Sequence, residues 1–563
     1  MTPVDLAPLL AHLETMSARG RTMLLPALHH AQSLYGWLPR EVQDAISRAL
    51  RVPAAEVHGV VEFYSMFYNQ PTAKQVVRMC EDPACSLAGA DKVWAAVNEH
   101  SAGEVTLERV TCLGLCEYAP AGLNGTRPAG DLTPESVPGF LAGAHPEPAP
   151  KVYGSPRWVL ARVGVADPAS LASYEAHGGY HGLRAALAIS PEDVIGLAEN
   201  SGIVGRGGAM FPLGRKWRFT RGAAGTPATK HIVVNADESE PGTFKDRVLL
   251  EDDPFSIIEA VTIAGYAAGA EQGWIFVRGE YPRAFARLEA AVRQARAAGF
   301  LGQDILGKTG FHFDIELRLG AGAYICGEET ALFEAIEGKR GFPRIKPPFP
   351  VTNGLFDQPT AISNVETLAA FLAVLERGLE TWKSVGTAGS PGTKLFCLSG
   401  HVAKPGVYEL PFGATIRELI DMAGEVPGGK SIQTVLMGGA AGRFIGSDQL
   451  DTPLTYEDTR AKNIPLGSGV VQVFDETANL RQTLYELARF FAHESCGKCF
   501  PCSLGTQRQK EILGKDGRLG TADRLALQDI GFAMTQTSLC GLGQTAASAV
   551  LSALEDERFE IGD

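Results

Sequence analysis

The spacing of hydrophobic and polar positions divides this chain into segments of different type. Near the start, Leu6, Leu9, Leu10 and Leu13 recur at helical spacing, and two aromatic-rich segments follow, so we predict a helical bundle for residues 1–70. In residues 71–125, two short apolar runs, KQVVRMC and VTLERVTC, stand on either side of a helical stretch, ADKVWAAVNEH. This order of strand, loop, helix, strand and loop predicts an open α/β arrangement.

The later segments have their own patterns. Residues 126–154 are rich in Gly, Pro and Ala, which predicts a linker. Residues 155–389 contain apolar runs typical of parallel strands, HIVVNADE, WIFVRGEYP and FHFDIELRLG, the last leading through a glycine turn to a helix. Residues 390–476 alternate around Gly and Pro turns with one helix at 415–423, and residues 477–563 are helical by period. We therefore predict a multidomain α/β chain.

Length and composition limit the function classes. A chain of 563 residues is too long for one core, and 45% hydrophobic with 20% charged residues is ordinary for globular protein. A net charge of −13 argues against nucleic acid as a partner. The longest apolar run, residues 257–270, is interrupted by Glu259 and predicts a buried helix rather than a membrane span. The acidic N-terminus lacks a signal-peptide pattern, so we expect a cytoplasmic protein without direct membrane insertion.

Eight of the ten cysteines form two groups of four. These are Cys80, Cys85, Cys112 and Cys116, and then Cys496, Cys499, Cys502 and Cys540. The second group, C-x2-C-x2-C with a remote fourth cysteine, is typical of a [4Fe-4S] cluster, because three thiolates from one tight loop hold one cluster face. Zinc is the alternative ligand for both groups. Cys326 and Cys397 are left over, and we expect them to be packed as small apolar residues.

Glycines gather in ENSGIVGRGGAMFPLGRKW at residues 199–217. Such a loop lets backbone N–H groups approach a ligand, and Arg206, Arg215 and Lys216 add positive charge, which suits a phosphate-bearing cofactor. Taken alone, a glycine-rich loop is more often a simple turn. A second glycine turn, GAGAYICGEETAL at 320–332, departs from GxGxxG, so we do not expect a standard dinucleotide site.

Several motifs in one order carry a resemblance to a known family. They are the two glycine segments, NADESEPGTFKDR at 235–247, KPPFP at 346–350 and SNVETL at 363–368. Together they resemble the flavin-binding, NADH-oxidising subunit of respiratory complex I and its relatives in soluble hydrogenases and formate dehydrogenases. Residues 71–125 resemble the thioredoxin-like [2Fe-2S] subunit of the same complex, whose ligand spacing the first cysteine group matches. Residues 390–476 resemble the ubiquitin-like β-grasp insert of these proteins.

The resemblance implies an architecture and a set of cofactors. The fold would be an N-terminal helical bundle, a thioredoxin-like domain, an α/β flavin-binding domain, a β-grasp domain and a C-terminal helical bundle. The cofactors would be FMN, NAD(H), one [2Fe-2S] cluster on the first cysteine group and one [4Fe-4S] cluster on the second.

Site residues follow from the same resemblance. FMN would be held by Gly205, Arg206, Gly207, Lys216, Asn235, Asp237, Glu238, Tyr324, Glu328 and Asn364. The adenine of NADH would stack among Phe211, Phe219 and Phe349, with Glu240, Glu329 and Lys346 contacting the rest. Glu238 and Glu328 would orient the flavin and the nicotinamide. The alternatives are an ordinary core for the three phenylalanines and a solvated surface for the acids.

Three positions depart from the usual family residues. Met210 stands where glycine is common, Leu213 where threonine is common and Ser363 where asparagine is common. A methionine beside the flavin either crowds the nicotinamide or fills a gap. These departures bear on nucleotide affinity and on the choice between NADH and NADPH.

The function implied by the resemblance is transfer of a hydride from NADH to FMN, then of single electrons to the [4Fe-4S] cluster and to iron-sulfur partner subunits. The [2Fe-2S] cluster would store one electron or lie on the path. Two other functions stay open: the reverse flow, as the NAD-reducing end of a soluble formate dehydrogenase or hydrogenase, and a non-catalytic iron-sulfur scaffold. The terminal partner is expected on other polypeptides, so the chain would be cytoplasmic or at the cytoplasmic face of the membrane through its partners.

Overall fold

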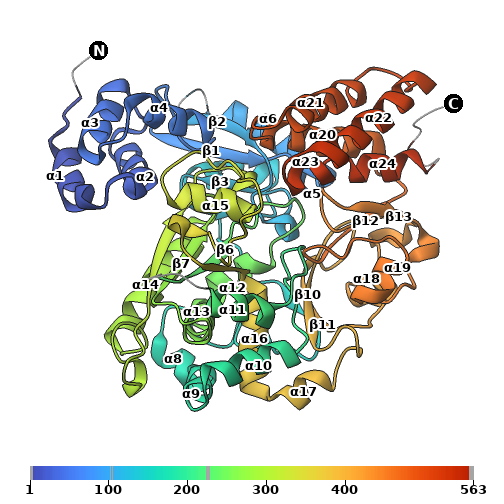
Figure 1. The fold of residues 1–563 in the computed structure, drawn as a ribbon. Helices are drawn as coiled ribbons and strands as arrows, with labels where there is room; N and C mark the ends of the chain where they lie inside the picture. The colour runs from blue at the N-terminus through green and yellow to red at the C-terminus, as the bar shows by residue number, and fades with distance from the viewer. Residues whose placement is uncertain (1–3, 102, 104, 224–228, 557–558, 560–563) are drawn as a thin grey trace.

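Four helices open the chain, as the apolar spacing predicts. The computed structural model describes residues 4–101, 103, 105–223, 229–556 and 559. The helices are α1 (Ala7–Met16), α2 (Leu24–Tyr35), α3 (Arg40–Leu50) and α4 (Ala54–Phe63) (Figure 1). They dock on the flank of the central sheet, where His29 Nε2 lies 3.0 Å from the carbonyl of Gly320 and Ser65 donates to the carbonyl of Gly322 at 2.9 Å.

A four-stranded sheet of order β2-β1-β3-β4 follows. Its strands are β1 (Gln75–Cys80), β2 (Val105–Val110), β3 (Gly122–Asn124) and β4 (Arg127–Ala129), and its helices are α5 (Pro83–Leu87), α6 (Ala90–Ser101) and α7 (Val137–Leu141). β1 and β2 are parallel, and β3 and β4 are antiparallel to their neighbours. The two strands and the helix between them lie where the sequence predicts them.

The linker predicted at residues 126–154 is different in the structure. β4 and α7 belong to the first sheet and its helices, and β5 (Val152–Tyr153) pairs with β11 (Gly406–Pro411) of another sheet. The Gly and Pro content suggested a segment without pairing, yet β4 is an edge strand, where proline is tolerated, and α7 carries its proline in the first turn. Composition therefore does not exclude short elements at sheet edges.

The central sheet is fully parallel, with the order β8-β7-β6-β9. Its strands are β6 (His231–Ala236), β7 (Gln272–Val277), β8 (Asp314–Leu319) and β9 (Thr360–Asn364). The helices around it are α8 (Leu171–Ala176), α9 (His181–Leu187), α10 (Pro191–Asn200), α11 (Leu213–Gly222), α12 (Lys245–Asp252), α13 (Pro254–Ala268), α14 (Pro282–Ala297), α15 (Glu329–Ile336), α16 (Val365–Arg377) and α17 (Leu379–Lys383). Because all four strands run the same way, their carboxyl ends meet at one edge, where such sheets bind ligands.

Helix α13 is the buried helix predicted around Glu259. All of its residues are buried, and the Glu259 carboxylate accepts hydrogen bonds from Tyr174 Oη (2.5 Å) and from the N–H groups of Tyr180 (2.6 Å) and Leu183 (2.7 Å). A buried carboxylate is stable only with such donors. Among the described helices, none is long and apolar enough to cross a bilayer.

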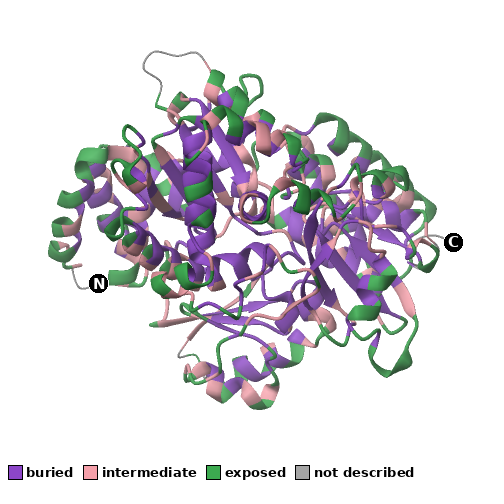
Figure 2. Ribbon diagram, turned by 90° about the horizontal axis from the view of Figure 1, so that it is seen from below, coloured by how far each residue is buried: buried purple, intermediate pink, exposed green. Residues whose placement is uncertain are grey.

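A mixed six-stranded sheet and a helical segment complete the chain. The sheet has the order β13-β12-β14-β10-β11-β5, with β10 (Thr393–Gly400), β12 (Ile432–Met437), β13 (Arg443–Ile445), β14 (Val470–Asp475), α18 (Ile416–Met422) and α19 (Tyr456–Ala461). The last helices are α20 (Leu480–Glu494), α21 (Phe500–Leu513), α22 (Thr521–Thr537), α23 (Gly541–Thr545) and α24 (Ser548–Leu554). Buried strands run through the interior (Figure 2), and one apolar cluster joins Leu28, Phe276, Leu332 and Leu487 from three parts of the chain.

Candidate functional site

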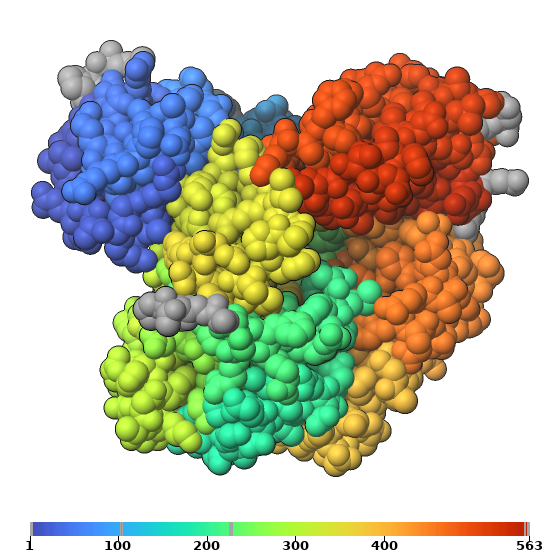
Figure 3. Space-filling model, in the orientation of Figure 1, coloured from blue at the N-terminus to red at the C-terminus, as the bar shows by residue number. Residues whose placement is uncertain are grey.

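A cavity of about 830 Å³ opens at the carboxyl ends of β6 and β9. One side is formed by the glycine loop at 207–210, the segment after β6 and the 3₁₀ helix η5 (Tyr324–Gly327). The other side is formed by residues 438–468 of the mixed sheet and by the start of α23 and α24. The surface is hollowed where these green, yellow, orange and red parts meet (Figure 3).

Most residues predicted for FMN line this cavity. They are Gly207, Asn235, Asp237, Glu238, Tyr324, Glu328 and Asn364. They come from segments far apart in the sequence and converge because β6, β9 and β8, which precedes η5, end at the same edge of the sheet.

Gly205, Arg206 and Lys216 lie behind the cavity wall instead. Arg206 is buried and forms an ion pair with Glu366 at 3.0 Å, and its N–H donates to Thr367 Oγ1 at 2.9 Å. Lys216 donates to the carbonyl of Ile362, and burial lowers the pKa of its ammonium. The Arg206 guanidinium is thus paired with a buried carboxylate and does not line the cavity, and its contact with FMN stays a prediction.

The acidic residues after β6 have distinct surroundings. Glu238 accepts hydrogen bonds from the N–H groups of Asp246 (2.8 Å) and Arg247 (2.9 Å), at the start of α12. Burial, with the neighbouring Asp246 carboxylate, raises the pKa of Glu238 to about 8. Asp237 is buried beside it, and burial raises the pKa of this carboxyl well above its usual range.

Two further groups of side chains hold the η5 turn. Tyr324 Oη donates to Glu240, whose other oxygen accepts from the N–H of Ala441 at 2.7 Å. Glu328 caps α15 by accepting from Thr330 and Ala331 N–H, both at 2.9 Å. Lys346 Nζ bridges Glu328 (2.9 Å) and Glu329 (2.7 Å); burial opposes its charge, but these ion pairs raise the pKa of Lys346. Glu329 and Lys346 thus lie together beside the cavity rather than on its lining.

The three predicted adenine-stacking phenylalanines are exposed. Phe211, Phe219 and Phe349 are 40%, 46% and 57% exposed, so the ordinary-core alternative is wrong for them. The rings of Phe211 and Phe219 lie 6.4 Å apart between centroids. Met210, next to Phe211, lines the cavity with a left-handed backbone (φ 52°), whereas Leu213 and Ser363 are buried.

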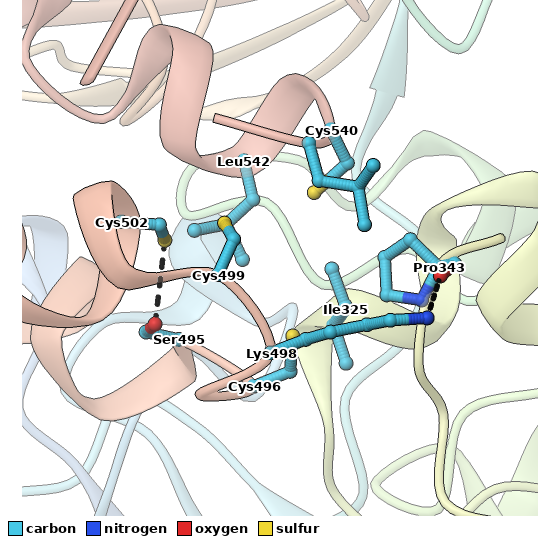
Figure 4. A pocket seen from close by; sticks show the side chains of 10 residues that line it. Ile325, Pro343, Ser495, Cys496, Lys498, Cys499, Cys502, Cys540 and Leu542 are labelled. Carbon is cyan, nitrogen blue, oxygen red and sulfur yellow. Dashed lines mark hydrogen bonds between the residues drawn. The ribbon is translucent and has the colours of Figure 1, made fainter. Parts of the chain in front are cut away.

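The second cysteine group surrounds a small hollow (Figure 4). Cys496, Cys499, Cys502 and Cys540 line it, together with Ile325, Pro343, Ser495, Lys498, Leu539 and Leu542. Cys496 and Cys499 lie in the loop between α20 and α21, Cys502 lies in the first turn of α21, and Cys540 follows α22. Lys498 Nζ donates to the carbonyl of Pro343 at 2.6 Å, which ties the cysteine loop to the segment after α15.

In the first cysteine group, Cys80 ends β1, Cys85 lies in α5, and Cys112 and Cys116 follow β2. Cys80, Cys85, Cys112 and Cys116 are buried, and the Sγ atoms of Cys112 and Cys116 are 3.4 Å apart. The N–H of Gly114 donates to Cys112 Sγ at 3.3 Å, as backbone donors do around cluster sulfurs. Arg278 fixes this loop to the flavin side of the chain by donating to the carbonyls of Cys112 and Glu238, both at 2.6 Å.

The segments that carry the cavity and the two cysteine groups match known protein families. Family models match residues 10–145 as a thioredoxin-like [2Fe-2S] ferredoxin, 198–373 as the Nuo51 FMN-binding domain, 395–431 as an SLBB domain and 482–562 as the NADH-ubiquinone oxidoreductase-F iron-sulfur binding region. The F subunit of the NADH-quinone oxidoreductase of Streptomyces coelicolor is 45% identical over 391 residues, which are 69% of this chain and 86% of that protein. The chain belongs to the family of NADH-quinone oxidoreductase F subunits.

Other relatives match nearly the whole chain. The alpha subunit of the NAD-reducing hydrogenase HoxS of Cupriavidus necator is 33% identical over 560 residues, 95% of this chain and 90% of that protein. A crystal structure of an NAD+-reducing [NiFe]-hydrogenase in the H2-reduced state superimposes with a TM-score of 0.84 at 31% identity, over 96% of this chain and 92% of that chain. These relatives are subunits of larger complexes. The protein is an FMN- and iron-sulfur-dependent NADH dehydrogenase module with a fused [2Fe-2S] ferredoxin.

The described residues of this NADH dehydrogenase module fit the cofactors of its family. Asp237 Oδ2 is buried on the cavity lining without a hydrogen-bond partner among the described residues, as expected of an atom that binds a ligand donor. A Cβ at Gly208 would meet no atom within 4 Å, so the loop leaves open space beside its backbone. Within the described ranges, no three His, Cys, Asp or Glu side chains converge on a single-ion position.

Sequence reasoning missed two sets of site residues. Lys245 and Asp246 line the cavity and belong to a buried ion network with Glu366, which lies 3.2 Å from Lys245 and 3.5 Å from Lys394. Burial opposes ionisation of Glu366, but the cations around it lower its pKa to about 2. The KDR sequence at 245–247 was a usable signal. The wall formed by residues 438–468 was missed entirely, because we assigned no chemistry to that segment.

Proposed function

We propose that this chain is the NADH-oxidising input subunit of a larger electron-transfer assembly. FMN would occupy the cavity, the [4Fe-4S] cluster the second cysteine group and the [2Fe-2S] cluster the first. One observation carries the proposal: Ile325 and Leu542 line both the cavity and the hollow of the second cysteine group. The two sites are therefore separated by a shared wall of side chains, which suits electron transfer between them.

When bound, FMN supplies the chemistry that converts the two electrons of a hydride into the single electrons that clusters carry. The residues of this chain would bind and orient. Asp237 would accept a hydrogen bond from the flavin, Tyr324 and Asn364 would line its ring and ribityl chain, and Lys245 would add positive charge to the cavity. Glu238 and Glu328 hold helices α12 and α15 in place, so we propose them as positioning groups.

We propose that NADH enters beside Met210. Phe211 and Phe219 offer exposed aromatic faces for the adenine, which stacking and apolar area both favour. Phe349 would add a third exposed ring to the adenine site, and Lys346, Glu240 and Glu329 would contact the rest of the nucleotide. Purified protein that kept its flavin oxidised during an anaerobic NADH titration would contradict hydride transfer to the flavin.

A second candidate direction has its own support. The NADH-quinone oxidoreductase relatives match 69% and 71% of this chain, whereas the NAD-reducing hydrogenase alpha subunit matches 95%, including the fused ferredoxin. This favours a soluble assembly in which a partner supplies electrons and this chain reduces NAD+. The same residues serve both directions, since catalysis accelerates a reaction forward and back alike.

Anaerobic affinity purification from the native cell, with mass spectrometry of the co-purifying subunits, tests the partner. Membrane subunits would support a respiratory NADH dehydrogenase, and a nickel- or molybdenum-containing subunit would support the NAD-reducing direction. A chain that purified without any iron-sulfur partner would contradict both. The cytoplasm is the proposed location, because the two cysteines not assigned to clusters, Cys326 and Cys397, form no disulfide, as in a reducing compartment.

We also propose the domain division in finer detail. The order β11-β10-β14-β12-β13 around α18 supports a β-grasp domain for residues 390–476, with β5 added at its edge. Residues 1–70 and 71–125 would form the helical bundle and thioredoxin-like domain, with the latter extended by β4 and α7. Residues 155–389 would be the flavin domain, and residues 477–563 the [4Fe-4S] domain.

A further inference from the structure

The carboxylate of Glu494 joins three segments: the one that carries Cys112, the η5 turn beside the flavin cavity, and the one that carries Cys496. Its Oε1 accepts a hydrogen bond from Thr111 Oγ1 at 3.1 Å, and its Oε2 accepts from the N–H of Tyr324 at 2.9 Å. Thr111 directly precedes Cys112 of the first cysteine group, and Tyr324 lines the flavin cavity. Glu494 itself ends α20, two residues before Cys496 of the second group.

The hydrogen bonds continue from this point into the mixed sheet. The Tyr324 hydroxyl donates to Glu240, and Glu240 accepts from the N–H of Ala441, which follows β12. Thr111, Glu494, Tyr324, Glu240 and Ala441 thus form a polar chain through four separate parts of the molecule. Each of these parts contributes a wall or a ligand loop to one of the cofactor sites.

The position of Glu494 is not explained by its own helix. A negative charge in the last turn opposes the helix dipole, so it does not stabilise α20 locally. A carboxylate carries two acceptor oxygens and no donor, and it can therefore hold donors from two different loops at once. Both oxygens are used in this way here.

We propose that Glu494 is the positioning residue that fixes the flavin loop and the two cysteine loops relative to one another. The proposal rests on the proposed function, from which it takes the positions of the cofactors. It adds a role for Glu494, which binds none of them. The competing explanation is simple packing of α20 against the ferredoxin part. Glu486, on the same helix, makes such a contact: it accepts from Ser86 Oγ at 2.6 Å and from Gln482 at 3.1 Å.

Four variants separate these explanations. Glu494→Ala removes both hydrogen bonds. Glu494→Gln keeps them, because the amide oxygen can accept from Tyr324 N–H while the amide nitrogen donates to the Thr111 hydroxyl. Thr111→Val removes only the contact to the first cysteine loop, and Glu486→Ala is the packing control for FMN release, because Glu486 contacts Ser86 beside Cys85 but does not line the flavin cavity. The measurements are the rate of FMN release, followed by flavin fluorescence, and the EPR spectra of both clusters in dithionite-reduced protein.

We expect Glu494→Ala to release FMN at least about tenfold faster, the scale of one lost charge-assisted hydrogen bond. Both cluster spectra should change in that variant. Glu494→Gln should stay within about twofold of the wild type. Thr111→Val should alter only the [2Fe-2S] spectrum, and Glu486→Ala should leave FMN release unchanged.

The proposal is overturned if Glu494→Ala releases FMN at the wild-type rate and has an unchanged [2Fe-2S] spectrum. It would then behave like the packing control in FMN release. If Glu494→Ala does not fold, the Thr111→Val variant decides instead. An unchanged [2Fe-2S] spectrum in Thr111→Val then overturns the proposal. Wild-type protein without FMN or cluster signals would instead contradict the proposed function.

Discussion

Asp237 shows how a single atom can indicate a ligand. Its Oδ2 is buried on the cavity lining and has no partner among the described residues, whereas neighbouring acids such as Glu238 and Glu240 are fully engaged with protein donors. Leaving a buried acceptor unpaired costs free energy, which a ligand donor would recover.

Replacing this carboxylate tests that role. We expect Asp237→Ala to weaken FMN binding about tenfold or more, because one buried hydrogen bond to the flavin is lost. The measurement is the FMN dissociation constant from fluorescence titration of the deflavinated protein. Asp252→Ala is the matched control, since Asp252 also has a buried unpaired oxygen but does not line the cavity. Equal affinity in the two variants would contradict the role of Asp237.

Met210 combines an unusual backbone with an unusual residue. A left-handed φ of 52° costs a non-glycine residue about 1 kcal/mol, and the residue lines the cavity. We expect Met210→Gly and Met210→Ala both to lower the KM for NADH, but only the glycine variant to gain thermal stability. Steady-state kinetics and thermal unfolding separate the two effects. An unchanged KM in both variants would show that the side chain does not crowd the nucleotide.

For single residues, the order of the sequence motifs predicted which side chains converge but not the direction in which each one points. Asn235, Asp237 and Tyr324 line the cavity as expected. Arg206 does not, because its partner Glu366 lies 160 residues further along the chain, and nothing local announces that pairing. A charged residue's role depends on the charges that fold against it, which a linear motif does not contain.

Helix α22 returns the chain to the hollow that the second cysteine group lines. It ends at Thr537, and Cys540 follows in the turn before α23. Without this helix, Cys496, Cys499 and Cys502 would lack their fourth partner.

Removing that partner should cost the cluster. We expect Cys540→Ala to lose about four iron atoms per chain, the content of a [4Fe-4S] cluster, while FMN content is retained. Iron and acid-labile sulfide analysis of anaerobically purified protein measures this. Cys326→Ala is the control, because Cys326 is buried beside the flavin loop and outside both cysteine groups. Full iron content in Cys540→Ala would contradict the ligand assignment.

Long elements were predictable and short edge elements were not. The parallel strands β6, β7 and β8 coincide with apolar runs, and α18 begins after Thr415, whose hydroxyl caps it. By contrast, β5 has only two residues and pairs with β11, more than 250 positions away. Its pairing is decided by the partner strand's exposed edge rather than by its own sequence.

For the molecule as a whole, two buried histidines make the stability of the folded state depend on pH in the acid range. His29 joins α2 to the loop after β8, and His231 begins β6, where its Nδ1 accepts from Trp274 Nε1 at 3.3 Å. Burial lowers the pKa of each from 6.5 to about 4. In the unfolded chain both protonate as pH falls through 6.5, whereas the folded protein resists protonation down to about 4.

We therefore expect stability to fall between pH 6.5 and 4, with His231 contributing about 3 kcal/mol to the loss. His231→Asn keeps an acceptor for Trp274 but does not titrate, so its melting temperature should fall less over the same range. Thermal unfolding at several pH values measures the difference. Parallel curves for wild type and variant would contradict this account.

The cavity wall formed by residues 438–468 marks the limit of prediction for the whole molecule. Its glycines and polar residues are typical of ordinary turns in a β domain, and they become part of the site only because the mixed sheet packs beside the parallel one. Contacts between sheets follow from the summed burial of many side chains, such as the apolar cluster that joins distant helices. No single motif encodes them.

The wall of Ile325 and Leu542 has a final consequence. Two aliphatic side chains hold no proton and offer no acceptor for a chain of water molecules. Electrons can tunnel through such side chains, whereas a proton finds no hydrogen-bonded relay along them. Because neither side chain ionises, we expect the two residues to add no pH dependence of their own to electron transfer between the sites.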